Sequence, residues 1–380
     1  MGGVSMEWKE CQIQDVCRLI NGRAYSNDEM LEHGKYKIVR VGNLSGGNST
    51  WFYSDLELPE DKYCHNGDLL FAWACTFGPH IWKEDNTIFH YHIWKIVEDK
   101  DVVDRRFFYY YLKYATGGFL GALNGSVMVH ITKSSMEKMN IRIPKNLEDQ
   151  RRIASILSSL DRKIELNNKI NADLEEMAQA IFKNWLSECT DEVAIGELSL
   201  NITNYEKTDA EEVVLINSSD VTEGYFDHHN YSPNKNLKGH FKKRFQKGDI
   251  LYSQVRPRNR HWAYCYFDAN DYLASTQLMV IRNNPSLITS ILLYQYIISD
   301  NVWKEFTLKT ETRSGTFPQG NYEDLSQIRV PYNSDFEGIS NQLETLYAKM
   351  FMLEKENSRL SLLRDTLLPR LMSGELEIPE

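Results

Sequence analysis

The sequence has few cysteines and no cysteine pattern of the kind that disulfide frameworks or zinc sites require. Its six cysteines are scattered over 380 residues without a Cys-x-x-Cys pair, which favours a reducing compartment. Long apolar runs are also missing, since residues 287–298, the longest, are interrupted by three polar residues. The first ten residues lack the basic and apolar regions of a signal peptide. We therefore expect a cytoplasmic protein that is neither exported nor inserted in a membrane.

Motifs that carry catalysis are missing too. There is no GxxxxGK[ST] loop to cradle nucleotide phosphates. An amino-methyltransferase needs an Asn- or Asp-Pro-Pro-aromatic motif, but Asn284-Pro285 is followed by serine and is explained by a turn. Asp68 and Asp249 each follow a glycine and could suggest a nuclease, yet a Gly-Asp turn entering a strand explains them without a metal. We expect no catalytic residue and no metal site in this chain.

The chain contains an internal repeat. The segment NGDLLF at residues 66–71 matches KGDILY at 247–252, which lies 181 residues later, and MNIRIP at 139–144 matches SQIRVP at 326–331. A glycine turn precedes each of the later matches, at residues 124–126 and 314–316, and a long helical pattern follows each proline. Because the matches keep their order, we interpret the chain as two diverged copies of one unit, a domain followed by a helix.

The front part of each copy mixes strand and helix signals. The first copy predicts strands at residues 36–41, 68–73 and 89–97 and a helix at 105–114. The second predicts strands at 213–217, 249–255, 262–267 and 278–282 and helices within 287–303. The expected fold class is α+β, with two mixed α/β domains at residues 1–146 and 189–333 separated by two long antiparallel helices at 147–188 and 334–374. This arrangement makes a pseudo-two-fold internal repeat, and residues 375–380 form a tail.

Both predicted helices carry apolar residues at three- and four-residue intervals, as in a coiled-coil seam. Spanning residues 148–186, the first would be about 60 Å long, more than one domain needs to close its core. Asn167, Asn168 and Asn357 interrupt the seams. A polar seam residue lowers stability but fixes register, so pairing between the helices and a solvated edge position are both open for them. The predicted helix-pair seam comprises Ile153, Leu157, Leu160, Ile164, Ile170, Leu174, Ile339, Leu343, Leu346, Met350, Leu353, Asn357 and Leu360.

Charge is distributed unevenly along the chain. The whole sequence has 43 basic and 53 acidic residues, a balance of −10, which argues against a uniformly basic nucleic-acid coat. Residues 235–262, however, contain nine basic residues against one acidic residue. Arg256, Arg258 and Arg260 follow a predicted strand, and Pro257 stiffens the segment, so we expect three displayed guanidinium groups. Phosphate positioning and base reading need such groups, and a solvated basic surface is the alternative.

Several segments together resemble the DNA specificity subunit of type I restriction-modification enzymes. The resemblance spans nearly the whole chain and is carried by Gly125-Ser126, by the segments at residues 130–133, 141–144 and 148–157, and by LLRDTLLPRLMSGEL at 362–376. It implies a non-catalytic protein with two target-recognition domains, each reading one half of a split, asymmetric duplex DNA site.

The resemblance also implies partners. Two modification subunits would dock on the chain and methylate adenine with S-adenosylmethionine, and restriction subunits would add ATP- and Mg-dependent translocation and cleavage, so this chain would bind no cofactor itself. We expect DNA contacts among Arg23, Tyr25, Lys35, His80, Lys83, Asn124, Ser126, His130, Lys242, Lys243, Arg244, Arg256, Arg258, Arg260, His261, Lys309, Thr312 and Arg313. Two alternatives are a coiled-coil interaction protein without DNA contact and a restriction enzyme fused to its recognition domain. The second would need an added catalytic module, for which the two copies leave no room.

Overall fold

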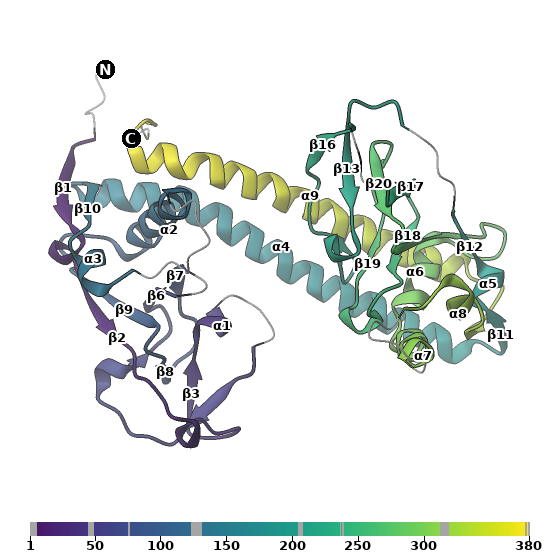
Figure 1. The fold of residues 1–380 in the computed structure, drawn as a ribbon, viewed down its shortest axis with the longest axis horizontal. Coiled ribbons are helices and arrows are strands. Elements are labelled where there is room, and N and C mark those ends of the chain that lie inside the picture. The colour runs from purple at the N-terminus through teal and green to yellow at the C-terminus, as the bar shows by residue number, and fades with distance from the viewer. Residues whose placement is uncertain are drawn as a thin grey trace. The chain divides into compact units, whose positions relative to one another are not determined.

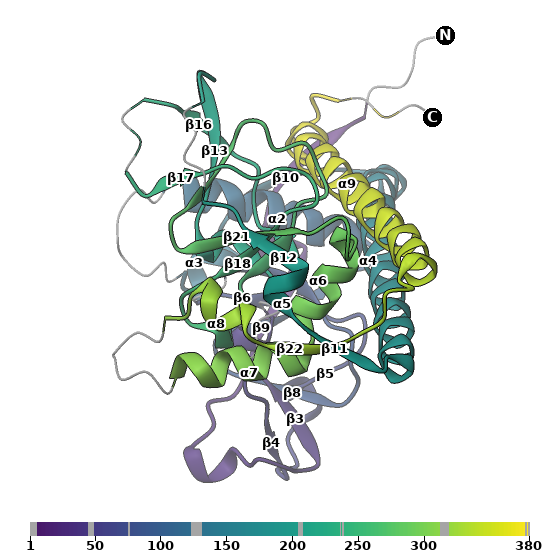
Figure 2. The ribbon, with the colours of Figure 1, turned by 90° about the vertical axis from the view of Figure 1, so that its right-hand side faces the viewer.

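The chain divides by contacts into two compact units. The computed structural model describes residues 6–44, 49–74, 77–122, 131–203, 208–235, 237, 239–311, 319–376 and 378. Unit 1 comprises Met1–Leu166 with Asn357–Glu380, and unit 2 comprises Asn167–Glu356. Each unit therefore holds one copy of the repeat together with part of each long helix, α4 and α9 (Figure 1 and Figure 2). None of the described helices combines the length and apolar character needed to cross a bilayer.

Unit 1 is built on two four-stranded sheets and a two-stranded ribbon. The sheet orders are β2-β9-β6-β7 and β4-β3-β8-β5, and β1 pairs antiparallel with β10. The named strands of this unit pair antiparallel apart from β3 and β8, which run parallel, and an isolated parallel bridge joins Arg23 to His90. The elements are β1 (Trp8–Gln12), β2 (Cys17–Asn21), β3 (Tyr36–Val39), α1 (Val41–Leu44), β4 (Phe52–Ser54), β5 (Tyr63–Cys64), β6 (Leu69–Ala72), β7 (Gly78–Ile81), β8 (Thr87–Phe89), β9 (Ile93–Glu98), α2 (Arg105–Ala122), α3 (Lys133–Glu137) and β10 (Asn140–Pro144).

Unit 2 repeats this plan. Its sheet orders are β12-β21-β18-β19 and β16-β13-β20-β17, β11 pairs with β22, and β13 runs parallel to β20 as β3 does to β8. A hairpin, β14 with β15, is added. The elements are β11 (Asp191–Ala194), α5 (Ile195–Leu198), β12 (Ser199–Asn201), β13 (Glu212–Ile216), β14 (Val221–Thr222), β15 (Tyr225–Phe226), β16 (Tyr231–Pro233), β17 (Phe241–Lys243), β18 (Ile250–Ser253), β19 (Trp262–Tyr264), β20 (Tyr272–Ser275), β21 (Leu278–Asn283), α6 (Ser290–Ile298), α7 (Asp300–Glu311), α8 (Tyr322–Ser326) and β22 (Arg329–Tyr332).

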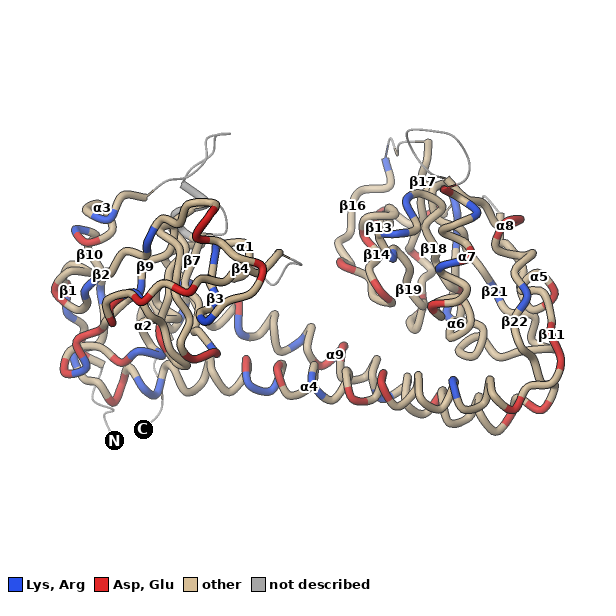
Figure 3. Tube along the Cα trace, turned by 90° about the horizontal axis from the view of Figure 1, so that it is seen from below, with Lys and Arg blue, Asp and Glu red and all other residues tan. Residues whose placement is uncertain are grey.

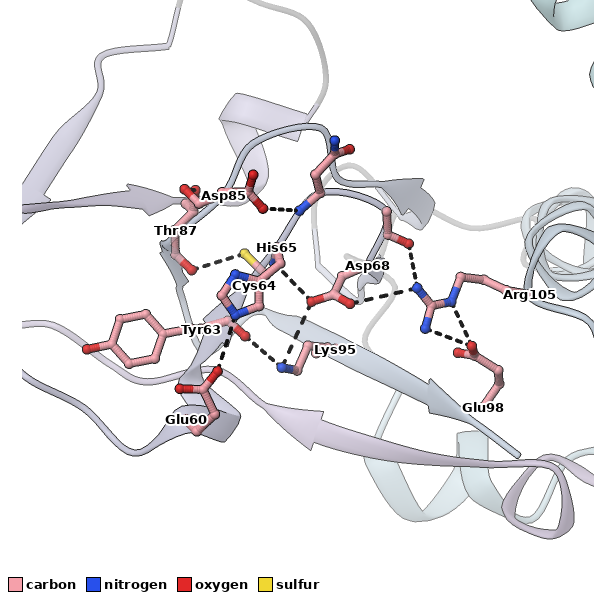
Figure 4. Close-up of polar contacts among 12 residues, drawn as sticks. Glu60, Tyr63, Cys64, His65, Asp68, Asp85, Thr87, Lys95, Glu98 and Arg105 are labelled. Atoms are coloured by element: carbon pink, nitrogen blue, oxygen red, sulfur yellow. Dashed lines mark hydrogen bonds and ion pairs between the residues drawn. The ribbon is translucent and has the colours of Figure 1, made fainter. Parts of the chain in front are cut away.

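The Gly-Asp turns confirm the internal repeat at the level of single bonds. Gly67 and Gly248 both have left-handed φ, 90° and 92°, which glycine adopts without a steric penalty. The Asp68 carboxylate accepts a hydrogen bond from the backbone three residues before it (2.9 Å), and Asp249 does the same (2.8 Å). Each carboxylate also faces a cation: Arg105 approaches Asp68 to 3.9 Å (Figure 4), and Arg282 pairs with Asp249 at 2.7 Å. Each aspartate therefore closes its own turn and pairs with an arginine of the same unit.

One predicted strand is wrong. The β-rich run at residues 89–97 divides into β8, which ends at Phe89, and β9, which begins at Ile93. The intervening residues turn the chain from one four-stranded sheet to the other, because β8 and β9 belong to different sheets. Alternation of apolar and polar residues continues through this corner, which is why the pattern alone predicts a single strand.

The long helices α4 (Leu147–Glu188) and α9 (Glu337–Ser373) pack antiparallel within each unit. In unit 2, Asn167 Nδ2 donates to Glu356 Oε2 (2.8 Å) and Asn171 Nδ2 donates to the Met350 carbonyl (3.3 Å). The partner's number falls as the α4 number rises, so the helices run in opposite directions. In unit 1, Arg364 of α9 pairs with Asp161 of α4 at 2.7 Å. The predicted helix pair is confirmed.

The part of the helix pair in each unit combines apolar and polar residues. Six of the predicted seam residues are buried, and Asn167 is buried as well, while the other predicted positions are half-buried. Asn171, which the apolar pattern passes over, is 8% exposed. The buried members are Ile153, Leu157, Ile339, Leu343, Met350 and Leu353, and the half-buried ones are Leu160, Ile164, Ile170, Leu174, Leu346, Asn357 and Leu360. Asn167 pairs with the other helix, which is one of the two interpretations left open by the sequence. Asn168 is exposed.

Beside this seam, unit 2 buries a carboxyl group. Glu354 of α9 lies near Tyr266, Tyr225 and Tyr294, and burial raises its pKa to about 7 although a hydrogen bond from Tyr266 works in the opposite direction. Ionising a carboxyl in such a place costs free energy, because water no longer solvates the charge.

We predict that Glu354→Gln stabilises unit 2 at alkaline pH but not at acidic pH. Between the ordinary glutamate pKa of about 4.5 and about 7, the unfolded chain ionises while the folded chain stays neutral, so stability falls as pH rises through this window and stays low above it. The uncharged amide should add roughly 1–3 kcal/mol to the free energy of unfolding at pH 8 and little at pH 5.

Urea unfolding at the two pH values measures the effect. Glu176→Gln, at an exposed position of α4, is the control and should have little effect at either pH. An equal gain for Glu354→Gln at both pH values would contradict a buried, titrating carboxyl.

Candidate nucleic-acid interface

The basic block of the second repeat, the segment at residues 235–262 with nine basic residues, contains a tight turn between β18 and β19. Arg256 and Arg260 flank a short 3-10 turn at Pro257–Asn259, and both have φ in the left-handed region, 50° and 54°. That conformation costs a non-glycine residue about 1–3 kcal/mol and persists only where surrounding contacts impose it. The turn must therefore be held from outside.

Helix α7 supplies those contacts. Trp303 Nε1 donates a hydrogen bond to the Pro257 carbonyl (2.8 Å). The Arg260 guanidinium lies 4.3 Å from the centre of the Trp303 ring and pairs with Asp300 at 3.2 Å. Arg258 pairs with Glu311 at the last position of the helix. Two of the three arginines are thus paired with carboxylates, although the Arg258 side chain remains 71% exposed.

A polar pocket of about 410 Å³ adjoins this turn. His261 Nδ1 donates to the Val221 carbonyl (2.8 Å), which leaves Nε2 of a neutral imidazole as an acceptor. Ser218 Oγ donates to Gln277 Oε1 (3.3 Å). The amide, hydroxyl, imidazole and guanidinium groups gathered here are those that read base edges in the major groove. The polar pocket is lined by Ser218, Ser219, Val255, Arg256, Asn259, His261, Gln277 and Gln319.

Sequence reasoning finds only part of this pocket. Arg256 and His261 are predicted contacts, but Ser218, Gln277 and Gln319 are not, because they are uncharged and lie in turns far apart in the sequence. The pairing of β13 with β20 and of β18 with β21 brings those turns together. No local sequence motif predicts these three pocket residues, because the composition of the pocket depends on which strand ends become neighbours in the fold.

Lys243 does not fit the predicted contact role. It is 5% exposed, and its ammonium group donates to the carbonyls of Leu278 (2.6 Å) and Thr276 (3.3 Å). Burial lowers its pKa. The Lys243 side chain therefore has a structural role in unit 2, because it donates hydrogen bonds to two backbone carbonyls near the start of β21.

The remaining basic candidates of unit 2 differ in availability. Lys242 is exposed, whereas Arg244 is half-buried and donates to the Asn270 carbonyl (2.6 Å). Lys309 pairs with Glu305, one turn earlier on α7, at 3.0 Å. Figure 3 shows Lys and Arg positions of this unit interspersed with Asp and Glu positions. The basic block of the sequence is therefore partly neutralised in the folded unit.

The predicted cations of unit 1 are likewise paired. Arg23 makes two hydrogen bonds to Glu29, at 2.6 and 2.9 Å. Lys35 pairs with Glu57, and Lys83 pairs with Glu165. Exposed pairs of this kind are weak, about 0–1 kcal/mol, so a phosphate could replace the carboxylate at Lys35 or Lys83 at small cost.

Two other predicted contacts of unit 1 are mostly enclosed. Tyr25 is 8% exposed, lies against the His90 ring, and its hydroxyl is buried without a partner among the described residues. His80 is half-buried in β7, and burial together with the charge of Lys113 lowers its pKa. Both side chains therefore fit packing better than DNA contact. The predicted contacts Asn124, Ser126, His130, Thr312 and Arg313 lie outside the described residues.

Comparison with known proteins finds similarity to one family over the first part of the chain. Residues 6–176 match the family described as "Type I restriction modification DNA specificity domain". The chain is 36% identical over 140 residues to the "Type I restriction enzyme HindI specificity subunit" of Haemophilus influenzae, covering 37% of this chain and 30% of the relative. It is 25% identical over 179 residues to the EcoBI specificity subunit of Escherichia coli, covering 46% and 36%. The matches thus span about a third of these relatives.

Likeness of fold extends over nearly the whole chain. A crystal structure titled as the type I restriction-modification system S subunit from M. genitalium superposes with a TM-score of 0.62, covering 96% of this chain and 96% of that one. The sequence identity is 18%, so this likeness concerns the fold. It covers both copies of the repeat and both long helices.

We predict that Trp303→Phe loosens the turn at residues 256–260 without unfolding unit 2. Phenylalanine keeps a ring beneath Arg260 but cannot donate to the Pro257 carbonyl, and the lost hydrogen bond should cost about 0.5–1.5 kcal/mol. The Arg260 amide, which donates to the same carbonyl (3.1 Å), should exchange its hydrogen faster in the variant. Leu308→Ala, at a position of the same helix that is 64% exposed, is the matched control and should leave exchange unchanged. Equal exchange in both variants would show that α7 does not hold the turn.

Proposed function

We propose that this chain is a type I restriction-modification specificity subunit that reads a two-part asymmetric duplex DNA site, a proposal that the sequence matches and the likeness of fold support. The observation that carries the proposal is the polar pocket beside the strained Arg256–Arg260 turn, because it gathers neutral base-reading groups next to cations. The two copies keep one framework but differ in their surface residues, so each should read a different half of the site.

The proposed role of this chain is recognition and scaffolding. Two modification subunits would carry the methylation chemistry with S-adenosylmethionine, and restriction subunits would use ATP and Mg for translocation and cleavage. The sequence supports this division, since it has neither a nucleotide loop nor the methyltransferase motif. This chain would bind DNA and proteins and no cofactor of its own.

The long helices are the proposed docking surface for the modification subunits. Five of the eleven large apolar side chains exposed in the described part of the chain lie on α4 or α9. The helices contain 42 and 37 of the 380 residues, so these side chains are concentrated there. Three of the five lie on the unit 1 part of the helices and two on the unit 2 part, and exposed apolar side chains of this kind support a protein interface. They are Leu166, Met177, Met352, Leu362 and Leu363.

We predict that Arg256→Ala changes DNA binding and that Lys243→Met does not. Both substitutions remove one positive charge, but only Arg256 lines the pocket, while Lys243 is buried. If Arg256 contacts a phosphate, its loss should weaken all duplexes and lower the salt slope by about one unit. If it contacts a base, the loss should cost about 1–3 kcal/mol at one position. Lys243→Met should lower the melting temperature and leave the salt slope unchanged.

Fluorescence anisotropy with labelled duplexes at several salt concentrations, with and without modification subunits, measures both effects. A wild-type chain that binds no duplex DNA in either condition would contradict the proposal and favour the coiled-coil interaction protein. A salt slope lowered equally by both substitutions would place the contact elsewhere.

We predict that Leu362→Glu combined with Leu363→Glu prevents assembly with modification subunits. These side chains are 70% and 46% exposed, so carboxylates should be tolerated in the free chain but not in an apolar interface. Leu308→Glu, at the 64% exposed position of α7, is the control. Deleting α9 would be less informative, since it supplies core residues to both units. Size-exclusion chromatography that shows an unchanged complex for the double variant would remove α9 from the docking surface.

A further inference from the structure

The internal repeat allows a surface of unit 1 to be identified from the polar pocket of unit 2. In unit 2 the backbone N–H of Gln254 donates to the Gln277 carbonyl (2.9 Å), and in unit 1 the N–H of Trp73 donates to the His92 carbonyl (3.1 Å). Both bonds join the end of the strand after the Gly-Asp turn, β18 or β6, to the residue just before the next strand of the sheet, β21 or β9. His92 thus occupies the place of Gln277, a pocket residue.

A second correspondence fixes the other side of this surface. Asn217 precedes the pocket serines, and its N–H donates to the Asp220 carboxylate (2.8 Å). Arg40 follows β3 as Asn217 follows β13, and its N–H donates to the Asn43 side chain (3.0 Å). Both bonds span three residues, so Arg40 takes the place of Asn217. The unit 1 counterpart of the pocket therefore lies between Arg40 and His92.

The residues at this place in unit 1 form an aromatic cluster. Ring centroids of His90, Tyr91 and His92 lie 3.8–5.0 Å apart, and the Trp73 ring lies 4.9 Å from His92. Trp73 Nε1 donates to the Tyr91 carbonyl (2.9 Å), which fixes the turn. Tyr91 is 40% exposed. These three turn residues are the ones that interrupt the predicted strand at residues 89–97.

Arg40 brings a positive charge to this cluster. Its guanidinium lies 5.2 Å from the centre of the Phe52 ring, and within the described ranges no carboxylate pairs with it, whereas Glu29 holds Arg23. Burial, His92 and Arg40 together lower the pKa of His90 to about 4. That imidazole is neutral at pH 7 and does not add a second charge beside the guanidinium.

We infer that Arg40, Tyr91 and His92 determine the specificity of unit 1, with Arg40 reading a guanine in the half-site that this unit contacts. The inference rests on the proposed function and adds which residues of unit 1 carry it. Arginine suits the two acceptors of guanine in the major groove, while an exposed aromatic ring suits the thymine methyl group. In unit 2 the place of His92 is taken by Gln277, which lines the pocket and whose amide suits adenine.

Selection from duplex libraries tests the inference with the full chain, alone and bound to modification subunits. Arg40→Ala should reduce the preference at one guanine of one half-site by roughly 5- to 150-fold and leave the other half unchanged. Gln277→Ala, a pocket substitution in the other copy at the place of His92, should act on the other half only. Arg40→Lys keeps the charge but not the two-pronged geometry, so it should lose the preference as well.

Three outcomes would overturn the inference. One is an Arg40→Ala variant that keeps both preferences while the wild type is selective. Another is an Arg40→Lys variant that restores full selectivity, because the contact would then be a phosphate contact. The third is a loss of preference in both halves accompanied by a lower melting temperature, which would indicate a packing role. A wild-type chain without any sequence preference would instead remove the proposed function and this inference with it.

Discussion

The antiparallel pairing of α4 with α9 is the constraint on which both units depend. The core of unit 1 contains Leu368 and Met372 from the helix that follows the second repeat. The core of unit 2 contains Phe182 and Trp185 from the helix that follows the first. Burying each such side chain contributes about 1.5–3 kcal/mol, so neither repeat completes its core without a segment that the chain order assigns to the other. The two repeats therefore depend on each other for folding, because each completes its core with a helix that follows the other.

Polar groups set the register of this pairing. Only one alignment of the helices allows Asn167 and Asn171 to form their hydrogen bonds in unit 2. In unit 1, the ion pair between Asp161 and Arg364 has the same requirement. A sliding helix would leave buried amides or charges without partners, at a cost of about 1–3 kcal/mol for each group. With the framework so fixed, surface turns can change freely. At the same strand ends, unit 2 has the amides of Asn217 and Gln277, whereas unit 1 has Arg40 and the ring of His92.

The sequence predicts the framework well because the framework is periodic. The 181-residue repeat becomes two matching sets of strands, and the helix predicted at residues 148–186 is observed as Leu147–Glu188. Helical periodicity and glycine turns are local signals, so they can be identified without tertiary information.

The recognition surfaces are predicted poorly, because they depend on tertiary pairing. Arg258 and Arg260 form a basic run in the sequence, yet α7 pairs both with carboxylates. Lys243 is counted in that run but satisfies buried carbonyls. Gln277 has no local signal at all, and it becomes a pocket residue only because β18 pairs with β21. Charge density along a sequence thus overestimates the charge that a folded surface displays.

The central claim is that two diverged copies on one helical framework read two different DNA elements. Selection of bound duplexes from a fully randomised library by the wild-type chain with its modification subunits tests it most directly. The account predicts two unlike, non-palindromic elements separated by positions without preference. A palindrome, a single continuous element or an unselected pool would contradict it.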